Sequence, residues 1–242
     1  MALATRRDLL LGAGVLGVAG VVSGTMGVTP ASAAAAARPG RDFVTGSLDL
    51  HLLRRATYGP TPASLAAIRR MGRGAWLDQQ LHPSTIDDSD CTRLIHNKFP
   101  QLFWTIPQAN NRVSEGDRWP YMIDLGMATI ARAIWSKRQL FEMMVEFWSN
   151  HLHVTCPTNK VWLSRHDYDT KVIRKHALGR FEDMLVASAQ HPAMLTYLNN
   201  AESSKVEPNE NYGRELLELH TVGFDGGYNE AEMYQSALIM TG

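Results

Sequence analysis

The run PNENYGRELLELHTVG, residues 208–223, decides the fold, because it has the pattern of one amphipathic helix. At about 100° per residue, three apolar residues share one face and three polar residues share the opposite face. The apolar set is Tyr212, Leu216 and Leu219, and the polar set is Asn211, Glu215 and Glu218. Asn209 is the expected N-cap and Gly223 the expected stop. Since such a helix buries its apolar face against other helices, the run predicts a helical protein.

The polar face of this run allows two interpretations. Arg214 lies four residues after Glu210 and four before Glu218, which is the spacing of ion pairs on an exposed helix. The same groups could instead line a buried polar network. His220 is expected to fall away from the carboxylates.

The rest of the chain predicts a succession of amphipathic helices with little strand signal. The expected helices cover residues 47–58, 62–71, 75–81, 121–135, 137–151, 167–176, 181–190 and 192–198. Between residues 84 and 119 the periodicity weakens among prolines and glycine, which predicts an irregular lobe. The fold class is therefore mainly α, a multi-helix globular bundle.

Four further segments accompany the run: FWSNHLHV (147–154), HALGRF (176–181), HPAML (191–195) and DGGY (225–228). Together with residues 208–223 they resemble the bacterial exported family catalogued as domain of unknown function 1800. The resemblance extends from about Leu48 to Gly242 and is weakest over residues 85–119. That family has no assigned chemistry, so the resemblance implies relatives and not a reaction. Because such relatives continue further, we expect the helical domain, residues 47–242, to be incomplete at its C-terminus.

The N-terminus indicates the compartment. TRRDLLL (5–11) looks like a twin-arginine export motif, followed by an apolar stretch at 9–22 and a small-residue cleavage site, ASA, at 31–33. We expect a signal peptide over 1–33 and a flexible lead over 34–46. The mature protein is then secreted or extracytoplasmic, in the cell envelope. The apolar stretch is shorter than the ~20 residues of a spanning helix, so no transmembrane helix is expected after cleavage.

The composition excludes several classes of protein. Lys and Arg number 24, as do Asp and Glu, so the charge is balanced and no nucleic-acid partner is expected. An envelope protein is a candidate partner. The two cysteines allow one disulfide bridge or two free thiols, and they exclude a disulfide framework.

The helix that ends at His151 carries a candidate metal site. His151 continues an apolar stripe, which is usual for a satisfied core histidine. However, His153 comes to the same side if the chain is extended there, and Glu146 lies on the same helix. Imidazole and carboxylate groups suit zinc, iron or manganese, so His151, His153 and Glu146 are the candidate ligands.

The run at 208–223 could complete such a site. Its candidate catalytic residues are Glu215, Glu218, Arg214 and His220, and the candidate binding residues are Asn150, Asn209, Glu210 and Asn211. The Glu-x-x-His spacing of ferritin-like di-iron proteins is missing.

The sequence is therefore compatible with two alternative functions. One is a metal-assisted hydrolase or oxidoreductase that acts outside the cytoplasm. The other is a non-catalytic envelope or secreted module, for binding or structure. In that second case a buried network fixes the helix register, and its members are Arg214, Glu215, Glu218, Asn211 and His151.

Overall fold

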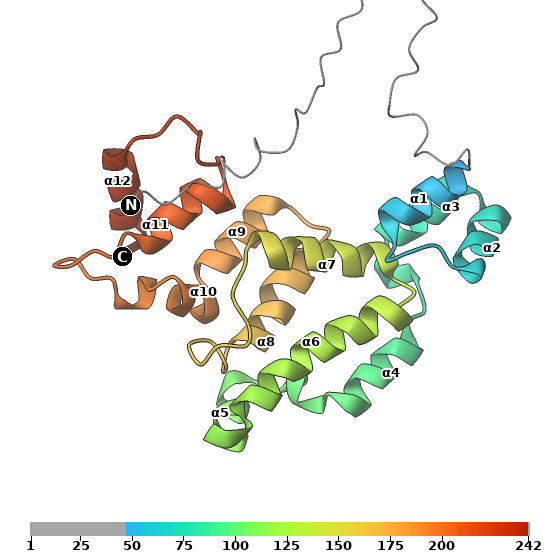
Figure 1. Cartoon of the computed structure of the whole chain (residues 1–242), viewed down its shortest axis with the longest axis horizontal. Helices are drawn as coiled ribbons and strands as arrows, with labels where there is room; N and C mark the ends of the chain where they lie inside the picture. The colour runs from blue at the N-terminus through green and yellow to red at the C-terminus, as the bar shows by residue number, and fades with distance from the viewer. Residues whose placement is uncertain (1–46, 242) are drawn as a thin grey trace, which may run out of the picture. The chain divides into compact units, whose positions relative to one another are not determined.

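The computed structural model describes residues 47–241, and within them the protein is helical and contains no strand (Figure 1). The twelve α-helices are α1 (Leu48–Ala56), α2 (Pro62–Met71), α3 (Arg73–Leu81), α4 (Ser89–Lys98), α5 (Ile106–Arg112), α6 (Arg118–Trp135), α7 (Gln139–His151), α8 (Arg165–Tyr168), α9 (Phe181–Ala189), α10 (Pro192–Tyr197), α11 (Asn211–Glu215) and α12 (Glu230–Thr241). The mainly α class is thus confirmed. The predicted signal peptide and lead, residues 1–46, lie outside the described residues.

Two short π-helical segments extend α-helices of the fold. Asp169–Arg174 continues α8, and Leu216–His220 continues α11. In a π-helix each turn closes over one more residue than in an α-helix, and such turns occur frequently at functional sites. The helices predicted over 167–176 and 208–223 are therefore partly π-helical.

The first three helices begin and end where local signals place them. The Ser47 hydroxyl accepts a hydrogen bond from the Leu50 amide, and Thr61 and Ser64 form a reciprocal capping box ahead of α2. Gly72 ends α2 with φ +85°, a conformation that favours glycine. These helices close on a small core of Leu53, Ala56, Ile68 and Trp76.

The region from 84 to 119 is more regular than the sequence predicted. It contains α4 and α5, joined by 3-10 turns, in place of an irregular lobe. α4 is stabilised because Cys91 and Ile95 pack against Leu125 and Ala128 of α6, whereas α5 begins at a capping box of Thr105 and Gln108. Tertiary contacts thus stabilise a helix whose local periodicity is weak.

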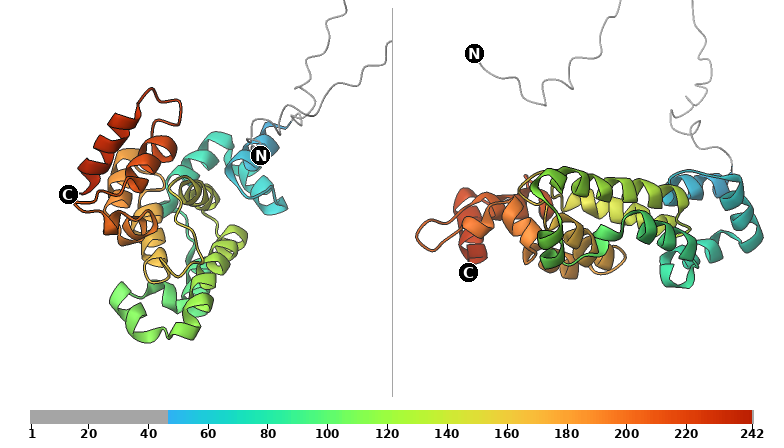
Figure 2. Two further views of the ribbon diagram at one scale, coloured as in Figure 1. Left: turned by 60° about the vertical axis from the view of Figure 1, so that its left-hand side comes forward. Right: turned by 90° about the horizontal axis from the view of Figure 1, so that it is seen from below.

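The largest core lies among α7 to α11. Tyr168, Ile173, Met184, Met194 and Tyr212 are fully buried there. α11 and α12 lie side by side (Figure 2), and Gly213 lets them approach closely. A Cβ atom on Gly213 would lie 2.7 Å from the backbone nitrogen of Ala237.

The structure shows the state of the two cysteines and the length and hydropathy of the described helices. Cys91 and Cys156 are both free thiols. Within residues 47–241, no helix combines the length and hydropathy needed to cross a membrane.

Candidate functional site

The π-helical turn after α11 changes which residues of the 208–223 run are buried. Leu219, predicted to share the face of Tyr212, is 62% exposed, while His220 is buried. Each residue of a π-turn rotates through a smaller angle, so His220 and not Leu219 comes round beneath Tyr212. Their ring centroids are 6.2 Å apart. The predicted apolar face is therefore wrong at Leu219.

His220 is buried, and one of its two ring nitrogens has no hydrogen-bond partner among the described residues. Its Nδ1 atom is buried and forms no hydrogen bond to any described residue. Burial, and next the charge of His151, lower the pKa of His220 to about 4. The imidazole is thus held neutral at physiological pH.

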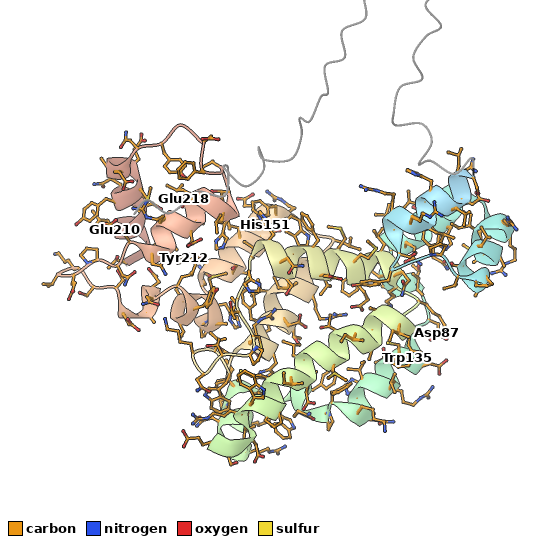
Figure 3. The ribbon with its side chains drawn as sticks, viewed as in Figure 1. Asp87, Trp135, His151, Glu210, Tyr212 and Glu218 are labelled. Carbon is orange, nitrogen blue, oxygen red and sulfur yellow. The ribbon has the colours of Figure 1, made fainter. Side chains whose placement is uncertain are left out.

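The candidate residue Arg214 forms a surface cluster with three carboxylates. Its guanidinium lies 3.7 Å from Glu210, 3.3 Å from Glu218 and 3.0 Å from Glu230. Glu210 and Glu218 lie with Tyr212 in the α11 region, where Figure 3 labels them. The Arg214 side chain is 36% exposed, so this cluster is a solvated one. The i, i+4 pairing expected on an exposed helix is therefore formed.

The remaining polar residues of the run make contacts that are separate from one another. Asn211 donates from Nδ2 to the Leu198 carbonyl, and Asn209 accepts from the Asn211 amide while Glu210 occupies the N-cap position. Glu215 joins neither set, and burial, with the nearby charge of Glu218, raises its pKa. The run contributes helix-capping contacts and an ion cluster, and these do not merge with His151 into one network.

His151 and His153 have different partners. Nε2 of His151 donates to the His220 carbonyl at 3.0 Å, and its ring contacts those of Phe147 and Phe181. His153 is exposed and its Nε2 lies 3.2 Å from the Thr155 hydroxyl. Over residues 47–241, no group of three or more His, Cys, Asp or Glu side chains is placed to hold a metal ion. The predicted ligands His151, His153 and Glu146 are thus not brought together.

Glu146 and Asn150 instead line a groove between α6 and α7, two helices that are close where the chain connects them and diverge from there in Figure 1. The groove has a volume of about 710 Å³. One wall is an apolar face of α6 that consists of Ile123, Met127, Ile130 and Ile134. Each of these four residues is at least 40% exposed. Exposed apolar patches of this extent mark binding surfaces.

The opposite wall of the groove is polar and includes a buried carboxylate. Asp169, at the start of a π-helical segment, lines the groove and is only 6% exposed. Its side chain forms no hydrogen bond or ion pair with any other described residue. Arg165 lines the groove too and adds one positive charge; it donates to the Val154 carbonyl and the Ser149 hydroxyl, while its Nη1 atom is buried without a partner among the described residues. Asp169 and Glu146 therefore give the polar wall a net negative charge.

Buried polar networks do occur in this fold, at positions other than those predicted. Arg174 holds both carboxylate oxygens of Glu142, at 2.7 and 2.9 Å. Nδ1 of His191 accepts from the Ala193 amide, so its Nε2 carries the proton and donates to Asp167 at 3.0 Å. Each pair joins two different helical segments and so fixes their register.

Sequence reasoning missed Asp169, Arg165 and Tyr58 as residues of the groove. One signal could have identified Asp169, since it shares an apolar helical face with Val172 and Ile173, where a carboxylate is unusual. Tyr58 follows α1 and donates from its hydroxyl to the Glu142 carbonyl at 3.1 Å. No local pattern predicts that contact, which joins residues 84 positions apart.

The fold and the groove define the class of this protein. It is a helical protein with an amphipathic groove between α6 and α7 and an ion cluster around Arg214. Its family follows from the sequence match. The chain belongs to the family described as "Protein of unknown function (DUF1800)", whose model matches residues 51–242. Comparisons with curated proteins and with solved structures give no match.

Proposed function

We propose that this chain is a non-catalytic, extracytoplasmic module that binds an amphiphilic ligand with a cationic head in the groove between α6 and α7. The observation that carries the proposal is the unpartnered Asp169 carboxylate opposite the exposed apolar face of α6. Location outside the cytoplasm rests on the twin-arginine motif at 5–11.

The size of the groove favours a small molecule. Ligand pockets typically measure about 300–1,000 Å³ and combine apolar walls with a few polar groups. The groove volume of about 710 Å³ falls in this range. A second cavity of about 900 Å³ adjoins it, since Tyr58, Ala133 and Ile134 line both. An extended alkyl chain could therefore lie along α6 from one cavity to the next.

The charge of the polar wall favours a cationic head group. Asp169 is only 6% exposed, yet its carboxylate oxygens are not among the fully buried atoms without a partner, so they are open to the groove and available to a cationic group. Arg132 and Arg174 lie near enough to feel its charge, but neither pairs with it. An ammonium group bound at Asp169 would give this carboxylate the charged partner that the described residues do not supply.

A binding titration tests this proposal with dodecylamine as the probe and dodecanoate as its matched anion, both below micelle concentration. In D169N, which keeps the side-chain shape, we expect dodecylamine to bind at least about tenfold weaker, a loss of about 1.4 kcal/mol. The control D225N changes an exposed carboxylate outside the groove and should bind like the parent. Equal affinity of D169N and the parent for dodecylamine would contradict the proposed head-group site.

A second pair of variants tests the apolar wall. I130S places a hydroxyl on the α6 face and should weaken both probes, whereas I239S changes an exposed residue of α12 and should weaken neither. If I130S and I239S bind both probes alike, the α6 face is not the binding surface.

The metal-assisted hydrolysis or oxidation predicted from the sequence stays a prediction. Its test is the metal content of histidine variants, because imidazole ligands are specific and their loss opens the coordination shell.

A further inference from the structure

We propose that a third cavity, between α4, α6 and α7, binds a small oxyanion of the size of inorganic phosphate through Arg132. The cavity measures about 130 Å³ and is lined by three arginines, Arg132, Arg138 and Arg174. It shares no lining residue with the groove, so the proposal is independent of the proposed function.

The two carboxylates of this cavity are already satisfied. Asp88 accepts from the Ser136 hydroxyl at 2.8 Å and from the Lys137 amide at 2.7 Å. Glu142 is held by both terminal nitrogens of Arg174. Neither carboxylate therefore has a strong need for a further cation.

Arg132 is the one arginine of the cavity without a partner among the described residues. Arg138 donates from Nε and Nη2 to the Ile86 carbonyl, at 3.3 and 3.1 Å, and Arg174 is paired. The side chain of Arg132 forms no hydrogen bond or ion pair within residues 47–241, and its Nη1 atom is buried.

Arg132 is half-buried, and its Nη1 atom is fully buried without a partner, which is unfavourable unless an anion compensates it. Burial, and next the charge of Arg174, lower the pKa of Arg132, while Asp169 and Glu142 oppose that effect from a distance. An uncompensated buried charge is among the most destabilising groups in a protein. An oxyanion in the cavity would accept the hydrogen bonds that Arg132 lacks.

Neighbouring groups complete a site for such an anion. The Thr92 hydroxyl and the His96 ring line the cavity, and His96 stacks on Phe103 with centroids 3.7 Å apart. Both side chains can donate hydrogen bonds. A water molecule takes about 30 Å³ in the liquid, so the cavity has room for an anion of about four or five non-hydrogen atoms.

The experiment is a titration with inorganic phosphate at constant ionic strength, with chloride as the comparison salt. Binding is measured by calorimetry, and stability is measured as the melting temperature. The full chain should bind phosphate saturably and melt at higher temperature as a result. R132Q should bind at least tenfold weaker. R132K should fall between them, because an ammonium lacks the planar fork of a guanidinium.

The matched control is R180Q, which removes an exposed arginine that does not line the cavity and should leave phosphate binding unchanged. Absence of a saturable phosphate effect in the parent protein overturns the proposal without recourse to any variant. Equal phosphate affinity of R132Q and the parent, with both folded by circular dichroism, overturns it as well.

Discussion

Two buried tyrosines differ in whether their hydroxyl group has a hydrogen-bond partner, and this difference determines how each hydroxyl affects the free energy of unfolding. Tyr168 and Tyr212 are both fully buried in the same core. The Tyr168 hydroxyl donates to the Leu152 carbonyl and contacts the Ser188 hydroxyl, while that of Tyr212 has no partner among the described residues. Burial raises the pKa of both groups, so both are neutral phenols.

We expect Y212F to leave the free energy of unfolding unchanged or to raise it, because it removes an unsatisfied buried polar atom. Y168F should lower that free energy by about 1–3 kcal/mol, since Leu152 or Ser188 then loses its partner. Urea unfolding of the two variants beside the parent measures the difference. A larger loss for Y212F than for Y168F would contradict this account.

The histidines at the end of α7 allow the metal and structural interpretations to be separated. From the contacts of His151, we expect H151A to lower the free energy of unfolding by about 1–3 kcal/mol, because the His220 carbonyl loses its donor. H153A, at an exposed position, should change it by less than about 0.5 kcal/mol.

Elemental analysis of the same proteins, purified without chelator, completes this test. The structural interpretation predicts equal metal content in parent, H151A and H153A. Stoichiometric metal in the parent that disappears in either variant would restore the predicted metal site.

At the scale of elements, the contact between α11 and α12 depends on one small residue. Gly213 faces the backbone of Ala237, and backbone atoms cannot move aside as the end of a flexible side chain can. Gly126, in α6, has no atom within 4 Å of an added Cβ. The two glycines therefore form a matched pair.

We expect G213A to lower the free energy of unfolding by about 1–3 kcal/mol through overpacking. G126A should raise it by up to about 1 kcal/mol, because alanine favours an α-helix more than glycine does. Thermal or urea unfolding checks both values. Stabilisation by G213A similar to that by G126A would show that α11 and α12 do not approach as closely as described.

At the scale of the whole molecule, buried histidines make the fold sensitive to acid. Burial lowers the pKa of His166, His191 and His220 below their usual value of 6.5. In unfolded chains these groups regain that value, so on lowering the pH the unfolded state binds protons before the folded state does. These three histidines therefore lower the free energy of unfolding as the pH decreases from about 7 towards 4.

The contribution of His220 alone can be estimated in magnitude. Its pKa of about 4 lies about 2.5 units below the usual value, and each unit corresponds to about 1.4 kcal/mol. We thus expect a loss of about 3 kcal/mol by pH 4, with most of the fall below pH 6. H220Q should flatten this pH dependence, and H51Q, at an exposed position, should not. Urea midpoints between pH 8 and 5 that stay constant in the parent would contradict the assignment.

The sequence alone determined the helical class and most helix bounds, because caps and apolar periodicity act over a few residues. Ser47, Thr61 and Gly72 begin or end their helices where the local pattern predicts. The i, i+4 pairs of Arg214 are also local, and they form as the spacing indicates.

Which groups meet across helices depends on the packing of segments that are distant in the chain. The π-turn that buries His220 and exposes Leu219 depends on packing against the core, as does α4 in a segment of weak periodicity. The groove brings α6 close to Asp169, and the third cavity contains the unpaired Arg132. Both are formed by residues far apart in the chain. Such contacts have no signature in local spacing, because their energy comes from burial and charge in a shared interior.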